Sequence, residues 1–126
     1  MKILLVEDNL LNQKVVIYNL KKFNLDIIAV TNGVDAIDNV KNTKFDLILM
    51  DIMLPGMNGF EITVEIRKYE KDLGIDDNKV PIIALTANTY DNDRYKCIEA
   101  GMNDYLSKPF TADQLAVKIG KFIDLE

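Results

Sequence analysis

Four short segments of the chain are almost continuously apolar, and this feature restricts the fold more than any other. They cover Lys2–Val6, Asp26–Val30, Asp46–Met50 and Pro81–Leu85, and a shorter β-rich segment follows at Asp104–Leu106. A strand that does not alternate between apolar and polar residues is buried on both faces, which is typical of a parallel sheet covered by helices. The chain therefore predicts an α/β fold with a parallel sheet at its centre.

The stretches between these segments are long enough for crossover helices, and several carry helical spacing. We expect five helices, which run from about Asn9 to Phe23, from Gly33 to Asn42, after the turn at residues 55–59, from Thr89 to Ala100, and after Thr111. Val15, Val16 and Leu20 are expected to face inward from the first helix. Ile62, Ile66 and Tyr69 form a stripe on the third, and Leu115, Ile119, Phe122 and Ile123 form one on the last.

Helix ends can also be predicted. Thr111 and Gln114 have the spacing of a capping box at the start of the last helix, and Gly101 is a suitable C-terminal stop for the fourth. Cys97, inside the fourth helix, is expected to pack as a small apolar residue and not to act as a redox thiol.

Composition excludes several classes of function. The length of 126 residues predicts a single domain spanning 1–126. A net charge of −5 disfavours nucleic acid as a partner, and the absence of His removes the commonest general base and zinc ligand. The single Cys97 fits a reducing compartment, and no apolar run is long enough to span a bilayer. We therefore expect a cytoplasmic domain without membrane contact.

Polar residues follow the strand segments at the points where functional groups gather in parallel sheets. Glu7 and Asp8 follow the first segment, Asp51 the third, Thr86 the fourth, and Ser107-Lys108 the fifth. Three carboxylates at one edge repel one another and require a compensating cation, and Mg²⁺ suits an all-oxygen ligand set. With Lys108 and Thr86 beside it, a central carboxylate could act as the nucleophile of phosphoryl transfer.

Four stretches of the chain resemble the receiver domain of two-component response regulators. They are Ile3–Asn9 (ILLVEDN), Met50–Gly59 (MDIMLPGMNG), Ile82–Ala87 (IIALTA) and Gly101–Phe110 (GMNDYLSKPF). Each is weak alone, but the four together, in order and spacing, span essentially the whole chain. The resemblance implies a flavodoxin-like, doubly wound sheet of five parallel strands in the order 2-1-3-4-5 with five helices.

The resemblance also assigns roles at the acidic edge. It implies that Asp51 accepts a phosphoryl group from a phosphohistidine. Asp8 and Asp51 would bind Mg²⁺, or Mn²⁺ as a substitute, together with the backbone carbonyl of Met53, and Glu7 would act through a bound water. Lys108 would pair with the phosphoryl group.

The same resemblance implies a switch. Thr86 would bond the phosphoryl oxygen, and Tyr105 would turn inward with it and remodel a partner-binding surface. The Lys108-Pro109 bond is expected to be cis. The departures are small. Asn58 stands where Asp is common in the family. The side chains of Met53 and Asn88 are expected to tune the phosphoryl lifetime, while the Met53 backbone carbonyl keeps its place as a metal ligand.

The implied partners are a histidine kinase or a histidine phosphotransfer protein as donor, and a downstream effector. The domain would not be a conventional enzyme but would catalyse its own phosphorylation and dephosphorylation at Asp51. It would be a monomer or a phosphorylation-dependent dimer. Residues 9–15 and 101–105 resemble receivers of hybrid sensor histidine kinases, although a stand-alone receiver fits as well.

Other interpretations remain open. Residues 7–9 could simply cap the first helix, and Tyr105 could be a packing residue. A degenerate receiver acting as a protein-binding scaffold is the alternative function, although such domains lose residues that this chain keeps. An aspartate-nucleophile phosphatase is disfavoured because Met53 stands where a general acid is needed. A flavin-binding protein is disfavoured because an acidic segment follows the first strand.

Overall fold

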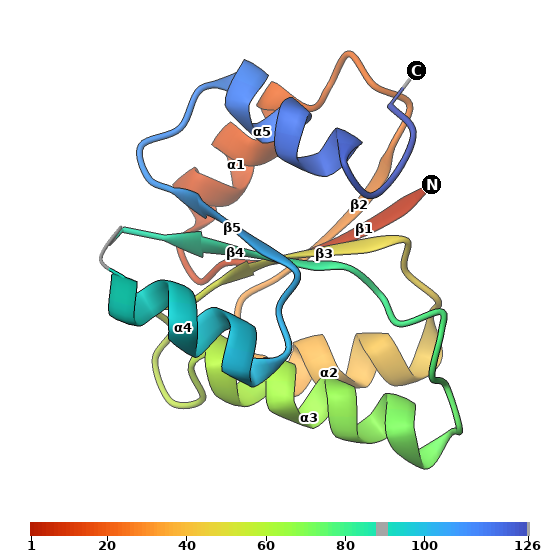
Figure 1. The fold of residues 1–126 in the computed structure, drawn as a ribbon. Helices are drawn as coiled ribbons and strands as arrows, with labels where there is room; N and C mark the ends of the chain where they lie inside the picture. The colour runs from red at the N-terminus through yellow and green to blue at the C-terminus, as the bar shows by residue number, and fades with distance from the viewer. Residues whose placement is uncertain (88–90, 126) are drawn as a thin grey trace.

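The computed structural model describes residues 1–87 and 91–125, in which strands and helices alternate (Figure 1). Their order is β1 (Lys2–Val6), α1 (Leu10–Asn19), β2 (Asp26–Val30), α2 (Gly33–Asn42), β3 (Leu47–Asp51), α3 (Gly59–Asp72), β4 (Ile82–Thr86), α4 (Asp91–Ala100), β5 (Asp104–Ser107) and α5 (Ala112–Gly120). Thr89, the expected first residue of the fourth helix, lies outside the described residues. The strands lie within one residue of their predicted bounds.

All neighbouring strands are parallel, in the order β2-β1-β3-β4-β5, which confirms the predicted topology. Helices α1 and α5 cover one face of the sheet, and α2, α3 and α4 cover the other (Figure 1). Successive side chains of one strand therefore enter different cores: Leu4 packs on the α2–α4 side and Leu5 on the α1–α5 side. Burial on both sides explains why the central strands show no polar alternation.

Two expectations about helix α1 are wrong. The helix ends at Asn19, and residues 20–23 form turns that lead the chain into β2. Val15 is 49% exposed, whereas Gln13, Val16 and Leu20 form the buried stripe. Each residue turns a helix by about 100°, so Val15 points away from the side on which Val16 meets the sheet.

The last helix is also shorter than its apolar pattern. It ends at Gly120, so Phe122 and Ile123 lie in the turn that follows it. Both still pack against the core on the α1–α5 side, because the turn carries them back over the sheet. The apolar spacing therefore predicted correctly which side chains pack against the core, but it did not predict where the helix ends.

The predicted helix caps are confirmed. Thr111 and Gln114 form a reciprocal capping box at α5. Gly101 ends α4 with a φ of +104°, a conformation that favours glycine. Cys97 is buried in the core on the α2–α4 side, as expected. Among the described residues, no helix is both long and apolar enough to cross a membrane.

Candidate functional site: an acidic cluster with a lysine

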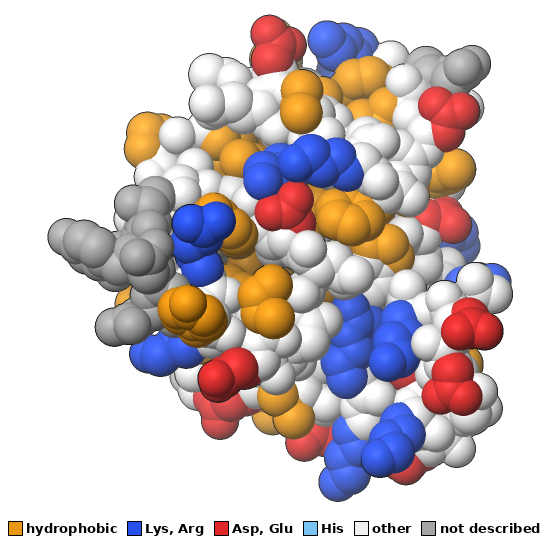
Figure 2. Space-filling model, viewed as in Figure 1, with side chains coloured by type: hydrophobic (Ala, Val, Ile, Leu, Met, Phe, Trp, Pro, Cys, Tyr) orange, Lys and Arg blue, Asp and Glu red, His pale blue; other side chains and the backbone are white. Residues whose placement is uncertain are grey.

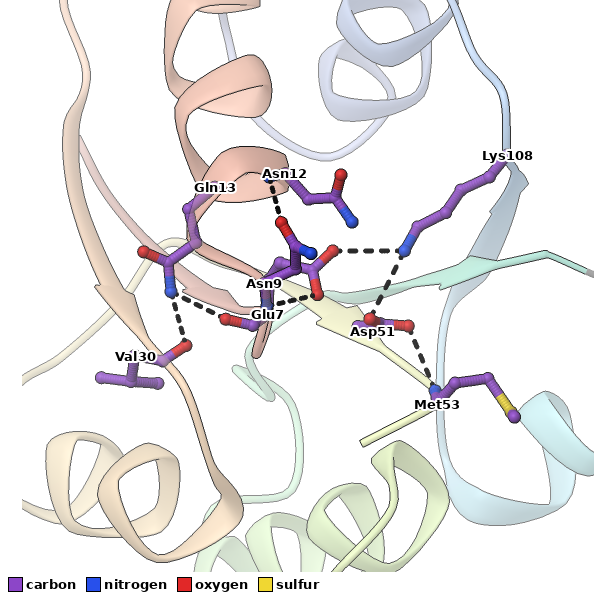
Figure 3. A network of polar contacts seen from close by, with 8 residues as sticks. All are labelled: Glu7, Asn9, Asn12, Gln13, Val30, Asp51, Met53 and Lys108. Carbon is purple, nitrogen blue, oxygen red and sulfur yellow. Dashed lines mark hydrogen bonds and ion pairs between the residues drawn. The ribbon is translucent and has the colours of Figure 1, made fainter. Parts of the chain in front are cut away.

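The carboxyl ends of the central strands bring the predicted site residues together. Glu7 and Asp8 follow β1, and Asp51 is the last residue of β3. One carboxylate oxygen from each of these three acids lies within 4.8 Å of the others. Figure 3 shows Glu7 and Asp51 converging on the amine of Lys108, which follows β5. The predicted acidic edge therefore exists as a compact cluster.

Burial makes the charge balance of this cluster important. Glu7 is 2% exposed and Asp51 is 4% exposed, whereas Asp8 is exposed to solvent. The Lys108 Nζ atom lies 3.2 Å from Glu7 Oε1 and 3.4 Å from Asp51 Oδ2. Three carboxylates and one ammonium leave two negative charges uncompensated. A divalent cation that prefers oxygen ligands would balance them, so this donor set fits Mg²⁺.

The segment after β3 holds the Asp51 side chain. The backbone N–H of Met53 donates to Asp51 Oδ1 at 3.1 Å (Figure 3). Gly59, the first residue of α3, donates its N–H to the Ile52 carbonyl at 3.0 Å. A Cβ at Gly59 would lie only 2.5 Å from the Asp51 carbonyl oxygen, so this approach requires glycine. Met53 thus borders the site, and the role expected for its carbonyl stays a prediction.

The segment after β1 is held by the start of α1. Asn9 accepts the Asn12 N–H at 3.0 Å, so the helix-capping interpretation is correct for Asn9. The Asn9 N–H donates to Glu7 Oε2 at 3.3 Å. The two oxygens of Glu7 are therefore engaged by Asn9 and Lys108. Capping and acid clustering coexist because they use different residues of the same short segment.

Gln13 is a site neighbour that the sequence analysis missed. Its buried side-chain amide donates to the carbonyls of Glu7, at 2.7 Å, and of Val30, at 3.2 Å (Figure 3). A polar residue in the buried stripe that contains Val16 and Leu20 was the signal that could have identified it.

Thr86 and Lys108 are joined through the backbone. Thr86 is 3% exposed, and its carbonyl accepts the Lys108 N–H at 2.7 Å. The cis Lys108-Pro109 bond is present as expected. Asn88 lies outside the described residues.

Tyr105 is half-buried at the α4–β5–α5 surface. The Arg94 guanidinium lies 5.1 Å from the centre of its ring and the Lys118 amine lies 5.2 Å from it. Tyr105 also packs against the core on the α2–α4 side. The residue is thus both a packing residue and a neighbour of two cations.

Comparison with known proteins agrees with this geometry. Residues 3–120 match the family model of the response regulator receiver domain. The chain is 42% identical to hybrid signal transduction histidine kinase B of Dictyostelium discoideum, over 95% of the chain and 6% of that protein. It is 40% identical to transcription factor SKN7 of Candida albicans, over 96% of the chain and 20% of that protein. The chain thus spans a small part of these relatives.

Solved structures are similar over nearly the whole chain. The receiver domain of sensor histidine kinase PA1611 from Pseudomonas aeruginosa, solved with magnesium in its active site cleft, is 41% identical with a TM-score of 0.82, and the match covers 96% of this chain and 95% of that one. The Ssk1 receiver domain of Saccharomyces cerevisiae, solved with the histidine phosphotransfer protein Ypd1, gives 35% identity, a TM-score of 0.90 and coverage of 97% and 88%. With this strand order, this acidic cluster and a family match over residues 3–120, the chain belongs to the response regulator receiver domains of two-component phosphorelays.

Proposed function

We propose that Asp51 is the phosphoacceptor of this receiver domain. The observation that carries the proposal is the meeting of a buried Asp51 with two further acids and Lys108 at the carboxyl edge of the sheet. In the reaction, an Asp51 oxygen forms a bond to phosphorus while the bond between phosphorus and the donor imidazole nitrogen breaks. The Lys108 amine lies 3.4 Å from the attacking Asp51 carboxylate. Its positive charge would stabilise the negative charge of the phosphoryl group as that group moves to Asp51.

The acidic residues would hold a metal ion beside Asp51. Asp8 and Asp51 supply side-chain oxygens, and Met53 supplies its backbone carbonyl. Glu7 contributes through a bound water, because Lys108 and Asn9 already engage its two oxygens. Bound Mg²⁺ supplies charge neutralisation for the incoming phosphoryl oxygens, and Mn²⁺, which also prefers oxygen ligands, would substitute for it. The magnesium of the PA1611 receiver domain supports this assignment.

Thr86 and Tyr105 form the proposed switch. The Thr86 hydroxyl would bond the phosphoryl group, and Tyr105 would move into the space that Thr86 leaves. In the structure the Tyr105 ring contacts the cations of Arg94 on α4 and Lys118 on α5. Movement of the ring would therefore break contacts on both helices. This face already exposes Tyr95, Ile98 and Val117, and Figure 2 shows hydrophobic side chains among Lys and Arg on it. We assign effector binding, or phosphorylation-dependent dimerisation, to this surface.

The phosphoryl donor would dock on helix α1. Leu11, Val15 and Tyr18 lie on one face of this helix and are exposed. A groove lined by Asn12, Val15, Lys108 and Phe110 connects this face with the site. We propose that the donor is a histidine phosphotransfer protein or the related domain of a histidine kinase. The complex of the Ssk1 receiver domain with Ypd1 supports this choice. The similarity to hybrid signal transduction histidine kinase B supports an origin in a longer hybrid kinase chain. The single cysteine supports a cytoplasmic location.

Mass spectrometry tests the phosphoacceptor. The intact protein is incubated with Mg²⁺ and acetyl phosphate, and Asp51→Asn is compared with Asp46→Asn, which changes the acid that directly precedes β3 at its opposite end. We expect one phosphoryl adduct in the wild type and in Asp46→Asn, dependent on Mg²⁺, and none in Asp51→Asn. An adduct of unchanged yield in Asp51→Asn would refute the assignment. Absence of an adduct from acetyl phosphate and from phosphorylated Ypd1 would favour the scaffold interpretation.

The docking face has a separate test. Leu11→Glu places a charge on α1, and Val34→Glu places one on an exposed apolar position of α2. We expect Leu11→Glu to slow phosphoryl transfer from phosphorylated Ypd1 by at least about tenfold while its reaction with acetyl phosphate is unchanged. Equal rates for the two variants would exclude α1 as the docking helix.

A further inference from the structure

Gln13 occupies an unusual position for a long polar side chain. It lies on the buried stripe of α1, and its residue is only 9% exposed. The groups that face its Nε2 atom are the carbonyl oxygens of Glu7 and Val30, both of which can only accept hydrogen bonds. An amide NH₂ has two hydrogens and satisfies both carbonyls at once. The contacts therefore favour a group with two N–H donors at this position, and the amide of Gln13 supplies both.

The two carbonyls belong to the ends of two neighbouring strands. Val6 pairs with Val30 in the last register position of β1 and β2, and the Glu7 N–H donates to the Val30 carbonyl at 3.0 Å. Beyond this point β2 ends and the chain turns into α2 at Asn32. The side chain of Gln13 thus binds the Glu7 carbonyl just where the backbone ladder stops. The amide therefore links the ends of β1 and β2 by side-chain hydrogen bonds, one residue beyond the last backbone pair.

The peptide that Gln13 holds connects Glu7 to Asp8. A hydrogen bond of 2.7 Å on the Glu7 carbonyl fixes the plane of this peptide, and with it the direction in which Asp8 leaves the backbone. Asp8 is the exposed member of the acidic cluster, so less packing restrains its side chain than restrains Glu7 or Asp51. Its placement within 4.8 Å of the other two acids therefore depends strongly on its backbone.

From these contacts we propose that Gln13 is a positioning residue for the metal site. It does not touch the ion; it holds the Glu7–Asp8 peptide so that the Asp8 carboxylate is already placed before the ion binds. The inference rests on the proposed function, because it assumes that Asp8 is a ligand. Loss of groups that orient metal ligands typically weakens affinity by about 10–100-fold. We expect the lower end of this range, because Gln13 acts through the backbone of the ligand.

The test compares Gln13→Met with Leu20→Ala. Methionine has nearly the length of glutamine, carries no charge and donates no hydrogen bond. Leu20, the C-cap of α1, is buried in the core on the α1–α5 side, about two helical turns along the chain from Gln13. Leu20→Ala removes packing there and serves as the control for a general loss of stability. Gln13→Asn, which keeps the amide but is one methylene too short to reach both carbonyls, is the second variant in case Gln13→Met does not fold.

Two measurements are made on each protein. In the metal-free state, the backbone amide resonance of Asp8 reports the hydrogen bond on the Glu7 carbonyl, because both belong to one peptide. Mg²⁺ affinity is then measured by calorimetric titration. We expect the Asp8 resonance to shift in Gln13→Met and Mg²⁺ to bind about tenfold more weakly, with Leu20→Ala within twofold of wild type.

The outcomes separate the two proposals. Unchanged affinity in Gln13→Met, or equal weakening in Leu20→Ala, would overturn the role of Gln13 and leave the metal site standing. A wild-type protein that binds no Mg²⁺ would overturn the proposed function, and the positioning role with it.

Discussion

Replacement of Asp51 by Asn should stabilise the metal-free protein, although it removes an ion pair. With an effective dielectric constant of about 20, the 3.4 Å contact with Lys108 provides about 5 kcal/mol of attraction. Glu7, within 4.8 Å, provides at least about 3.5 kcal/mol of repulsion. Asp8 is exposed, and with water screening we allow it about half that value. The Coulomb contributions therefore nearly cancel.

The remaining contribution is desolvation. Asp51 is 4% exposed, and burial of a charged carboxylate costs several kcal/mol, more than burial of a neutral amide. The Asn side-chain oxygen can still accept the Met53 N–H. We therefore expect the free energy of unfolding in EDTA to rise by about 2 kcal/mol, which corresponds to an increase in Tm of about 7 °C for a chain of this length.

Urea denaturation followed by circular dichroism, in EDTA and in Mg²⁺, measures this effect. Mg²⁺ at about 100 times its Kd should add about 2.7 kcal/mol to the wild type and less to Asp51→Asn, so the difference should shrink or reverse. Asp104→Asn is the control, because Asp104 pairs with Lys118 and Lys121 and its loss should lower stability. An Asp51→Asn protein less stable than wild type in EDTA would refute the charge argument.

Three further predictions concern the same site. Lys108→Met should cost about 3 kcal/mol of unfolding free energy in EDTA, because the buried Glu7 and Asp51 lose their cation, and Mg²⁺ should restore much of this loss; equal losses with and without Mg²⁺ would contradict it. Asp8→Asn should keep the fold by circular dichroism and weaken Mg²⁺ binding at least about tenfold by calorimetry, whereas an unchanged affinity would remove Asp8 from the ligand set. Gly59→Ala should lower stability by about 1–3 kcal/mol in urea denaturation, because its Cβ would meet the Asp51 carbonyl; wild-type stability would show that the segment after β3 moves freely.

The acidic edge was predictable because it depends on local order along the chain. A parallel sheet aligns the carboxyl ends of its strands, so any residue that follows a strand lies at the same edge. For this reason Glu7, Asp51 and Lys108 could be grouped before their distances were known. Their roles in phosphoryl transfer stay predictions.

Other features were not accessible from local patterns. Helical spacing identified an apolar stripe on α1 but did not show that Gln13 belongs to its buried side and Val15 to its exposed side. That division depends on the rotation of the helix against the sheet, which is set by packing. Similarly, the apolar stripe at the end of the chain continues past Gly120, because buried residues in a turn produce the same pattern as a helix.

The sequence by itself determined the parallel sheet, its helical crossovers and the chemical groups at one edge, because continuous apolar strands and the residues that follow them are local properties. Only the tertiary structure decided how those groups are paired. Lys108 meets Glu7 across 101 residues of chain, and Gln13 joins the ends of β1 and β2. Such contacts depend on the angles at which crossovers return to the sheet, and these angles come from the packing of both cores together.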